Sequence, residues 1–367
     1  MRAFRVISAT LAFLLMVSCA FAAKGKLNKV YDREFNVNAT TKLFIQNKYG
    51  QVNVENWDKN TISIHVEVKV DNASDDKAKI MLDAIDIEFS ESNNVVSAIT
   101  KFNEDLMRSH KRLFSSISND EMSIDYNIKM PKGNEVELNN KYGDIFINEL
   151  SGKVLVNLKY GNIRVNKLDR GDADGLNTLV IGYGNATIGD VNWLKVEIKY
   201  GNITIDKARA LVLLSKYSKV SVDNINSIVV DSKYDSYHLG TVANIVGESG
   251  YTSYSIKNLE KKFKLTTKYG GVKIGSVAND FDSIVFNGAY TGLKAGISSS
   301  ASYKIDAEVA YGNLKFESSK AKVNRIEGNT NVEVNGVVGA ESASSKVYIR
   351  SKYGSVSLVK TSSEDDE

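Results

Sequence analysis

Aspartates recur at one position of a repeated segment, and a pair of carboxylates is the minimum that glycoside hydrolysis requires. Asp206 and Asp223 each lie six residues after a repeated tyrosine, so they would occupy the same place on neighbouring turns. In the flanking copies this position is Gly189 or Gly240. A position shared by aspartate and glycine is typical of a tight turn, so we interpret both aspartates as turn residues and assign no catalytic residue.

The segment Asp169–Gly175 carries two short motifs and lengthens one copy of the repeat from 17 to 23 residues. Arg170-Gly171-Asp172 matches a tripeptide that animal adhesion receptors bind. Asp172-Ala173-Asp174-Gly175 resembles half of a calcium loop, but Arg170 stands where an acidic residue is expected and no distal glutamate follows. We interpret the segment as a solvated loop.

Other chemistry finds little support in the sequence. His65, His110 and His238 lack the spacing of metal ligands, and the chain contains no phosphate loop, nucleophile elbow or dinucleotide fingerprint. A net charge of +3 over 367 residues, without a basic block interleaved with aromatics, argues against a nucleic-acid partner. We therefore expect no metal, no cofactor and no enzymatic activity.

A periodic tyrosine indicates the kind of structure that carries these residues. Tyr183, Tyr200, Tyr217, Tyr234 and Tyr251 are 17 residues apart, and most repeated tyrosines stand in the tripeptide Lys-Tyr-Gly or a variant of it. The spacing then becomes 18 to Tyr269 and 21 to Tyr290 and to Tyr311. A period this short predicts a solenoid, because one unit cannot bury its own apolar face and must stack on its neighbours.

Each unit reads as two strands joined at the tyrosine. In Val154–Val165, apolar residues alternate before and after Tyr160, with a slip of one residue between the two runs. Alternation places the tyrosine on the inner face, in an aromatic ladder inside a rod of parallel strands, and the preceding lysine on the outer face. The slip requires a residue with positive φ, a role that we assign to the following glycine. Such glycines are Gly161, Gly184, Gly201 and Gly270.

The outward lysines allow two interpretations. They form either a solvated row that protects strand edges or a strip that binds anionic glycans or lipids. Lys199, Lys216 and Lys233 form the longest unbroken run, and Gly182 and Gly250 interrupt the row on either side of them.

An insertion separates Tyr49 from Tyr142. We expect strands at 61–70, 85–89, 95–100 and 122–130, a short helix at Ser74–Ala84 and a mobile polar loop at Phe102–Ser118. A solenoid exposes unpaired strand edges at its ends, so we interpret this insertion as an antiparallel N-terminal cap.

Tyr237 and Tyr254 occupy inner positions after the repeated tyrosine and are expected in the core.

The N-terminus is typical of an export signal, since Arg2 and Arg5 precede a short apolar run and Ala20-Phe21-Ala22 offers a cleavage site. Met16-Val17-Ser18-Cys19 also approximates a lipobox, so the alternatives are soluble release and a lipid anchor on Cys19. No later stretch is apolar enough to span a membrane. The predicted organisation is a signal peptide at 1–22, a β cap at 23–140, a parallel solenoid at 141–360 and an acidic disordered tail at 361–367.

Several of these features together resemble a known family. The signal peptide, Asn47-Lys48-Tyr49-Gly50, the strand at Pro131 that leads into Asn140-Lys141-Tyr142-Gly143, and the later Lys-Tyr-Gly turns are similar to the "putative adhesin" family of Gram-negative bacterial envelopes. The resemblance covers 35–359 and implies an all-β, single-stranded, right-handed parallel β-helix with a mixed β cap. It supplies no catalytic residues.

The functional expectation is a non-catalytic, exported β-solenoid in the periplasm or at the cell surface, serving as an adhesin or envelope scaffold. Glycans or envelope components would be its partners. Two alternatives stay open: a polysaccharide-active enzyme built on a β-helix, and a membrane-tethered envelope lipoprotein.

Overall fold

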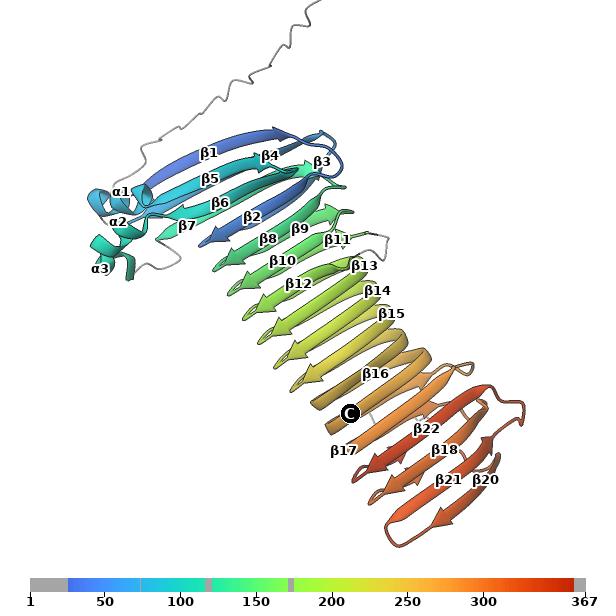
Figure 1. Ribbon diagram of the computed structural model, residues 1–367. Coiled ribbons are helices and arrows are strands. Elements are labelled where there is room, and N and C mark those ends of the chain that lie inside the picture. The colour runs from blue at the N-terminus through green and yellow to red at the C-terminus, as the bar shows by residue number, and fades with distance from the viewer. Residues whose placement is uncertain (1–25, 73, 116–120, 171–174, 360–367) are drawn as a thin grey trace, which may run out of the picture.

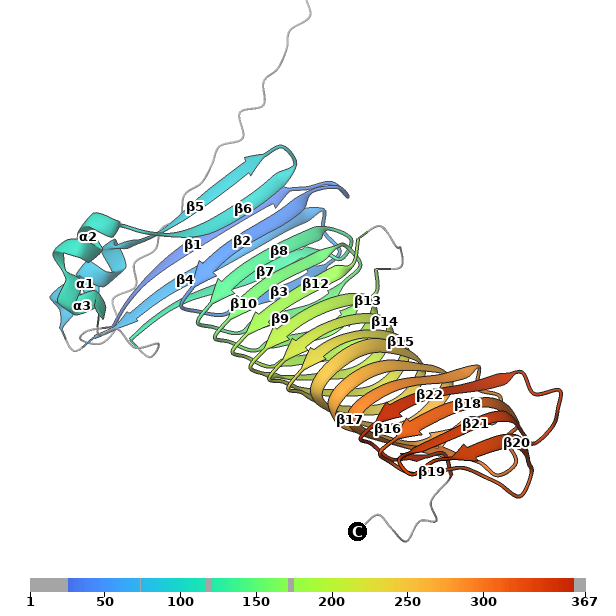
Figure 2. The same ribbon diagram turned by 60° about the horizontal axis from the view of Figure 1, so that its bottom comes forward.

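The computed structural model describes residues 26–72, 74–115, 121–170 and 175–359. The described part of the chain is all-β, with 70% of the described residues in strands and 6% in helices. The strands belong to one large sheet that mixes parallel and antiparallel pairs. Figures 1 and 2 show an elongated molecule in which successive strands stack along the long axis. The all-β prediction is therefore confirmed.

The central part of the molecule consists of parallel strand pairs in register, apart from one shift between β16 and β17 at Ile274–Val277. Its strands are β8 (Glu135–Lys141), β9 (Ile145–Leu150), β10 (Val154–Lys159), β11 (Ile163–Leu168), β12 (Asn177–Gly182), β13 (Ala186–Lys199), β14 (Asn202–Lys216), β15 (Lys219–Lys233), β16 (Ser236–Val277) and β17 (Ser283–Ile297). Leu194 of β13 pairs with Leu211 of β14, and Leu211 pairs with Ile228 of β15. Equivalent positions of the repeat thus lie side by side.

The core follows the alternation of the strands. Leu194, Val196 and Ile198 are fully buried in β13, whereas the residues between them are partly exposed. The same pattern recurs in β14 at Leu211 and Leu213. Because the buried positions are in register from turn to turn, their side chains form one continuous apolar core along the rod.

The N-terminal segment packs at one end of the stacked strands (Figure 1). It comprises β1 (Lys26–Asn36), β2 (Lys42–Lys48), β3 (Val52–Trp57), β4 (Thr61–Asp71), α1 (Asp75–Asp83), β5 (Ile85–Ser92), β6 (Val95–Phe102), α2 (Glu104–Ser109), α3 (Lys111–Ser115) and β7 (Met122–Pro131). The expected strands and the first helix are present. The prediction of a loop at Phe102–Ser118 is wrong in its described part, because α2 and α3 lie there. The side chain of Asn103 stabilises the start of α2 by accepting a hydrogen bond from the amide of Leu106 at 3.0 Å.

Pairing within this segment is mixed. Strand β4 pairs antiparallel with β1 and β7, and β5 pairs antiparallel with β6. Strands β2 and β3, which flank Tyr49, instead pair in parallel with β8 and β9, which flank Tyr142. The first Lys-Tyr-Gly unit therefore stacks directly on the second, despite the long insertion between them.

The C-terminal segment departs from simple stacking. It contains β18 (Tyr303–Ala310), β19 (Leu314–Lys315), β20 (Ala321–Glu327), β21 (Asn331–Val338), β22 (Ser345–Lys352) and β23 (Val356–Ser357). Strand β22 pairs in parallel with β17 on one side and with β18 on the other, so the last long strand is inserted between two earlier ones. Antiparallel β21 and β20 follow β18.

The stretch Asn329–Val334 connects β20 to β21 and begins β21, so it belongs to an antiparallel hairpin. The predicted signal peptide with Cys19 and the predicted acidic tail lie outside the described residues.

Candidate functional site

The repeated tyrosines are the most distinctive surface feature, and their orientation overturns the prediction of an inner ladder. The twelve repeated tyrosines all have a positive φ between 54° and 67°. Tyr49, at the N-terminal end, still packs against the core. From Tyr160 onward, they are 36% to 54% exposed. A non-glycine residue in this conformation costs roughly 1–2 kcal/mol, so twelve instances require a compensating interaction.

Stacking of the rings supplies that interaction. Each ring lies nearly parallel to the next, with centroids 4.7 to 5.3 Å apart, from Tyr49 to Tyr311. An aromatic pair contributes about 0.5–1.5 kcal/mol beyond its buried area, comparable with the backbone cost. We call these residues the tyrosine ladder: Tyr49, Tyr142, Tyr160, Tyr183, Tyr200, Tyr217, Tyr234, Tyr251, Tyr269, Tyr290, Tyr353 and Tyr311, in their order along the rod.

The glycines after the tyrosines have a different role from the one predicted. Positive φ belongs to the tyrosine, and Gly161, Gly184 and Gly201 have ordinary φ values. A Cβ on Gly201 would lie 1.9 Å from the carbonyl oxygen of Gly184, and one on Gly184 would lie 1.8 Å from that of Gly161. Glycine is therefore required at these positions, because the neighbouring turn leaves no room for a Cβ.

Asp235 occupies the position of the corner glycine in its turn, as Ser218, Thr252 and Thr291 do in theirs. Its buried carboxylate accepts hydrogen bonds from its own turn and from the preceding one. One oxygen accepts hydrogen bonds from the hydroxyls of Ser215 and Ser232, each at 2.8 Å. The other accepts from the amide of Ser218 at 2.7 Å. The carboxylate is thus satisfied within the protein, and we assign it a structural role.

Sequence reasoning missed this buried polar cluster, although a signal was present. The residue two positions before the ladder tyrosine is apolar at Leu158, Ile181 and Ile198. In the next turns, beginning with the one in which Ser218 replaces the corner glycine, it is Ser215, Ser232, Ser249 and Thr267. At the two ends of the ladder this position is also polar, at Asn47, Asn140 and Ser351.

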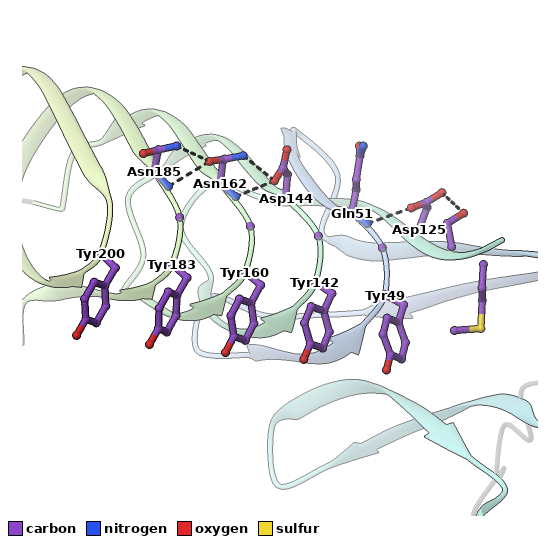
Figure 3. A pocket seen from close by; sticks show the side chains of 16 residues that line it. Tyr49, Gln51, Asp125, Tyr142, Asp144, Tyr160, Asn162, Tyr183, Asn185 and Tyr200 are labelled. Atoms are coloured by element: carbon purple, nitrogen blue, oxygen red, sulfur yellow. Dashed lines mark hydrogen bonds between the residues drawn. The ribbon is translucent and has the colours of Figure 1, made fainter. Parts of the chain in front are cut away.

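A row of amides and one carboxylate flanks the ladder on one side (Figure 3). Asn202 donates to the side-chain oxygen of Asn185, Asn185 to that of Asn162, and Asn162 to that of Asp144, each through its backbone and side-chain nitrogens at 2.7 to 3.2 Å. This row, the corner glycines and the tyrosines line a groove of about 930 Å³. The groove also contains Asp125, so its N-terminal end carries two carboxylates.

A row of lysines flanks the ladder through the residue that precedes each tyrosine. The lysine row consists of Lys48, Lys141, Lys159, Lys199, Lys216, Lys233, Lys268 and Lys352. Several ammonium groups lie over the neighbouring rings, with Lys48 Nζ 4.4 Å and Lys141 Nζ 4.8 Å from the centroids of Tyr49 and Tyr142. The outward position predicted for these lysines is confirmed by their partial or full exposure.

None of the eight lysines in this row has a carboxylate within ion-pair distance among the residues that the structure describes. Ten lysines elsewhere do: Lys26, Lys29, Lys42, Lys69, Lys101, Lys132, Lys167, Lys195, Lys261 and Lys322. The ladder strip, meaning the tyrosine ladder together with the lysine row, is therefore a line of cations without internal neutralisation.

The aspartates considered for catalysis lie on the surface. Asp206 and Asp223 are exposed and occupy equivalent places on β14 and β15. A second cavity, of about 440 Å³, includes the adjacent Lys207 and Asn224 but neither aspartate. The two carboxylates are therefore exposed neighbours at equivalent positions of adjacent strands.

The three histidines lie on separate elements of the structure. His65 Nδ1 lies 2.7 Å from Asp32 Oδ1, His110 lies at the end of α2, and His238 is exposed on β16. Across the described ranges, no three His, Cys, Asp or Glu side chains gather as metal ligands.

Part of the loop at Asp169–Gly175 is described. Burial raises the pKa of the Asp169 carboxyl. The ammonium groups of Lys132 and Lys167, at 3.2 and 3.4 Å from Asp169 Oδ2, lower this pKa by more, so it lies below its usual value. Residues 171–174 lie outside the described ranges, and with them most of both motifs.

Tyr237 and Tyr254 are buried, as predicted.

No family model and no curated protein matches this chain. Among solved structures, it is similar to a "putative adhesin" from Parabacteroides distasonis, with 11% identity over 73% of this chain and 93% of that one and a TM-score of 0.33. A "putative lipid binding protein" from the same organism has 11% identity over 72% and 96%, with a TM-score of 0.36.

A "putative cell adhesion protein" from Clostridium sporogenes has 13% identity over 90% of this chain and 99% of that one, with a TM-score of 0.21. These values are too low to assign an activity. In the described part of the chain, no helix has the length and apolar character needed to cross a bilayer.

Proposed function

We propose that this protein is an exported, non-catalytic β-solenoid of the kind that its sequence resembles, in which the N-terminal segment caps a rod of parallel turns. The rod presents the ladder strip as a long binding surface, in adhesion to other surfaces or in organising the cell envelope. The observation that carries the proposal is the continuity of the tyrosine ladder from Tyr49 to Tyr311.

The ladder is more than a device for stability. Inward tyrosines would have stabilised the rod through burial alone, at about 25 cal/mol for each Å² of apolar surface. Instead, the rings remain about half exposed, in a backbone conformation that costs free energy. An exposed, regular aromatic surface of this extent is typical of an interaction site.

The geometry specifies how the strip would bind. Both faces of each internal ring are covered by neighbouring rings, so sugar or base rings have no open face on which to stack. The ring edges and phenol hydroxyls remain available, and no hydroxyl of the ladder is bonded to another described residue. A partner would lie along the strip and form hydrogen bonds to hydroxyls and ammonium groups.

An array experiment tests this proposal. The chain from Ala23 onward is applied to glycans, matrix proteins and envelope components and compared with the variant Lys199→Glu, Lys216→Glu, Lys233→Glu. The matched control is Lys207→Glu, Lys257→Glu, Lys294→Glu, which changes the net charge equally at exposed positions off the strip.

We expect at least one class of array component to bind the unaltered chain and the control but not the strip variant. If every component that binds the chain also binds the strip variant equally well, the strip is not the binding surface. The proposed function then fails.

A further inference from the structure

Resting on this proposed function, we infer that the partner of the ladder strip is a linear acidic polysaccharide, a chain of sugars that bear carboxylates. Its main anchor is the N-terminal end of the lysine row, formed by Lys48, Lys141 and Lys159. The inference follows from the spacing of the cations, the groups beside them and the covered ring faces.

The lysine row has the form of a one-dimensional charge array. Lys48 pairs in register with Lys141, and Lys141 with Lys159, so the three lie on adjacent parallel strands about 4.8 Å apart. Like charges at this spacing repel weakly in water, and no carboxylate of the described chain offsets the repulsion. A linear polyanion laid along the row would relieve it.

On the side of the lysine row away from the tyrosine ladder, the groups beside the first three lysines favour an anion more than those beside the middle three. The outward row next to Lys48, Lys141 and Lys159 holds only amides, namely Gln46, Asn139 and Asn157. Two carboxylates farther along these strands already form ion pairs, Glu137 with Lys42 and Glu135 with Arg170. On the other side of the ladder, the groove carries Asp144, whose carboxylate accepts hydrogen bonds from Asn162, and Asp125.

The middle run of Lys199, Lys216 and Lys233 lies beside a different row. There, Glu197 and Asp231 flank Leu214 at the positions that hold amides in the N-terminal run. Glu197 is already paired with Lys195, so the carboxylate that would repel an approaching polyanion is that of Asp231. The N-terminal run is therefore the more favourable anchor.

Two other classes of polyanion fit the strip less well. Single-stranded nucleic acids gain much of their affinity by stacking bases on open aromatic faces, which the ladder does not offer. An anionic membrane is a plane, whereas the lysine row is one residue wide. A polysaccharide offers carboxylates to the ammonium groups and hydroxyls to the phenols along a single line.

The test measures affinity for polygalacturonate, with fully methyl-esterified polygalacturonate as the uncharged ligand of the same backbone. A single-stranded oligonucleotide and phosphatidylglycerol vesicles represent the other polyanions. The variants are Lys48→Gln, Lys141→Gln, Lys159→Gln and its charge-preserving counterpart Lys48→Arg, Lys141→Arg, Lys159→Arg. The control with the same loss of charge off the strip is Lys207→Gln, Lys257→Gln, Lys294→Gln.

We expect the unaltered chain, the arginine variant and the control to bind polygalacturonate. The glutamine variant of the anchor should bind roughly tenfold more weakly. The inference is overturned if the anchor variant and the control lose affinity for polygalacturonate equally, or if the methyl-esterified polymer binds as well as the acid form. It is also overturned if polygalacturonate does not bind at all, or if the oligonucleotide or the vesicles bind more tightly and in an anchor-dependent way. Strip-dependent binding on the arrays without binding to polygalacturonate would refute the inference alone and leave the proposed function standing.

Discussion

The ring of Tyr353 stacks on that of Tyr290 with centroids 4.7 Å apart, although a whole segment of chain separates the two residues in sequence. The other face of Tyr353 stacks on Tyr311 at 4.8 Å. The tyrosine ladder thus follows the order of the strands in space, because β22 lies between β17 and β18. The C-terminal strand is therefore an integral part of the rod.

The first prediction concerns this inserted strand. Ile349 is fully buried, and its strand partners are Phe286 on one side and Ala307 on the other. Ile349→Ala should lower the free energy of unfolding by about 2–4 kcal/mol, because it leaves a cavity between two turns. Urea unfolding followed by circular dichroism measures the change. Lys346→Ala, on the outer face of the same strand, should change it by less than about 0.5 kcal/mol, and equal effects would mean that β22 is not packed in this way.

The second prediction separates two explanations for the corner glycines. Gly201→Ala should destabilise the protein by about 1–3 kcal/mol, because the new methyl group would meet the Gly184 carbonyl. Gly271→Ala is the control, since a Cβ there has no heavy atom within 4 Å. Thermal unfolding of both variants checks the difference. A harmless Gly201→Ala would show that neighbouring turns can move apart.

The third prediction addresses the left-handed conformation of the ladder tyrosines. Tyr200 has a φ of 58°, which asparagine tolerates and a β-branched residue does not. Both Tyr200→Asn and Tyr200→Val lose two ring contacts, but the valine variant should be less stable than the asparagine variant by about 1 kcal/mol or more. Parallel denaturant titrations give this difference. Equal stability would indicate that the corner relaxes to negative φ.

The fourth prediction is a dependence of stability on alkaline pH. Burial raises the pKa of Tyr254 from its ordinary value of 10.0 to about 12, and the nearby hydroxyls of Ser249 and Ser232 oppose this rise. The Tyr254 hydroxyl has no hydrogen-bond partner among the described residues. Because the folded protein holds this proton more tightly than the unfolded chain, the contribution to stability is complete below pH 10. It is lost as the pH rises from 10 to 12.

Phenylalanine variants check this dependence. Tyr254→Phe should reduce the loss of stability between pH 10 and pH 12 and should cost little at pH 7, because no hydrogen bond is removed. Tyr237→Phe, by contrast, should cost about 1 kcal/mol at pH 7, since the Tyr237 hydroxyl lies 2.6 Å from that of Ser215. An unchanged alkaline slope in Tyr254→Phe would assign the effect to other buried tyrosines.

Local patterns along the chain were enough to predict the strands. Burial alternates along β13 and β14, as at Leu194, Val196 and Ile198, because successive side chains of a strand point to opposite faces. The period of 17 residues likewise predicts which positions become neighbours, as the pairing of Leu194 with Leu211 confirms. Both properties depend on residues close in sequence or on a repeat that is written in it.

The direction of the tyrosines could not be obtained in this way. Leu158 and Ile163 both point inward although they are five positions apart, so the alternation must break once between them. The sequence pattern does not indicate at which residue this break occurs. The break falls at Tyr160 because Gly161 must remain without a side chain where the turns meet. That constraint comes from the backbone of the neighbouring turn, which is not encoded in the local pattern.

Periodicity therefore sufficed for the elements and their stacking in the regular part of the rod, because each turn repeats the same short-range rule. The exposed ladder, the place of Tyr353 between Tyr290 and Tyr311, and the row of lysines without carboxylate partners in the described chain depend on which turns come to lie beside each other. Contacts between turns exist only once the chain has folded, so only the tertiary structure could place them.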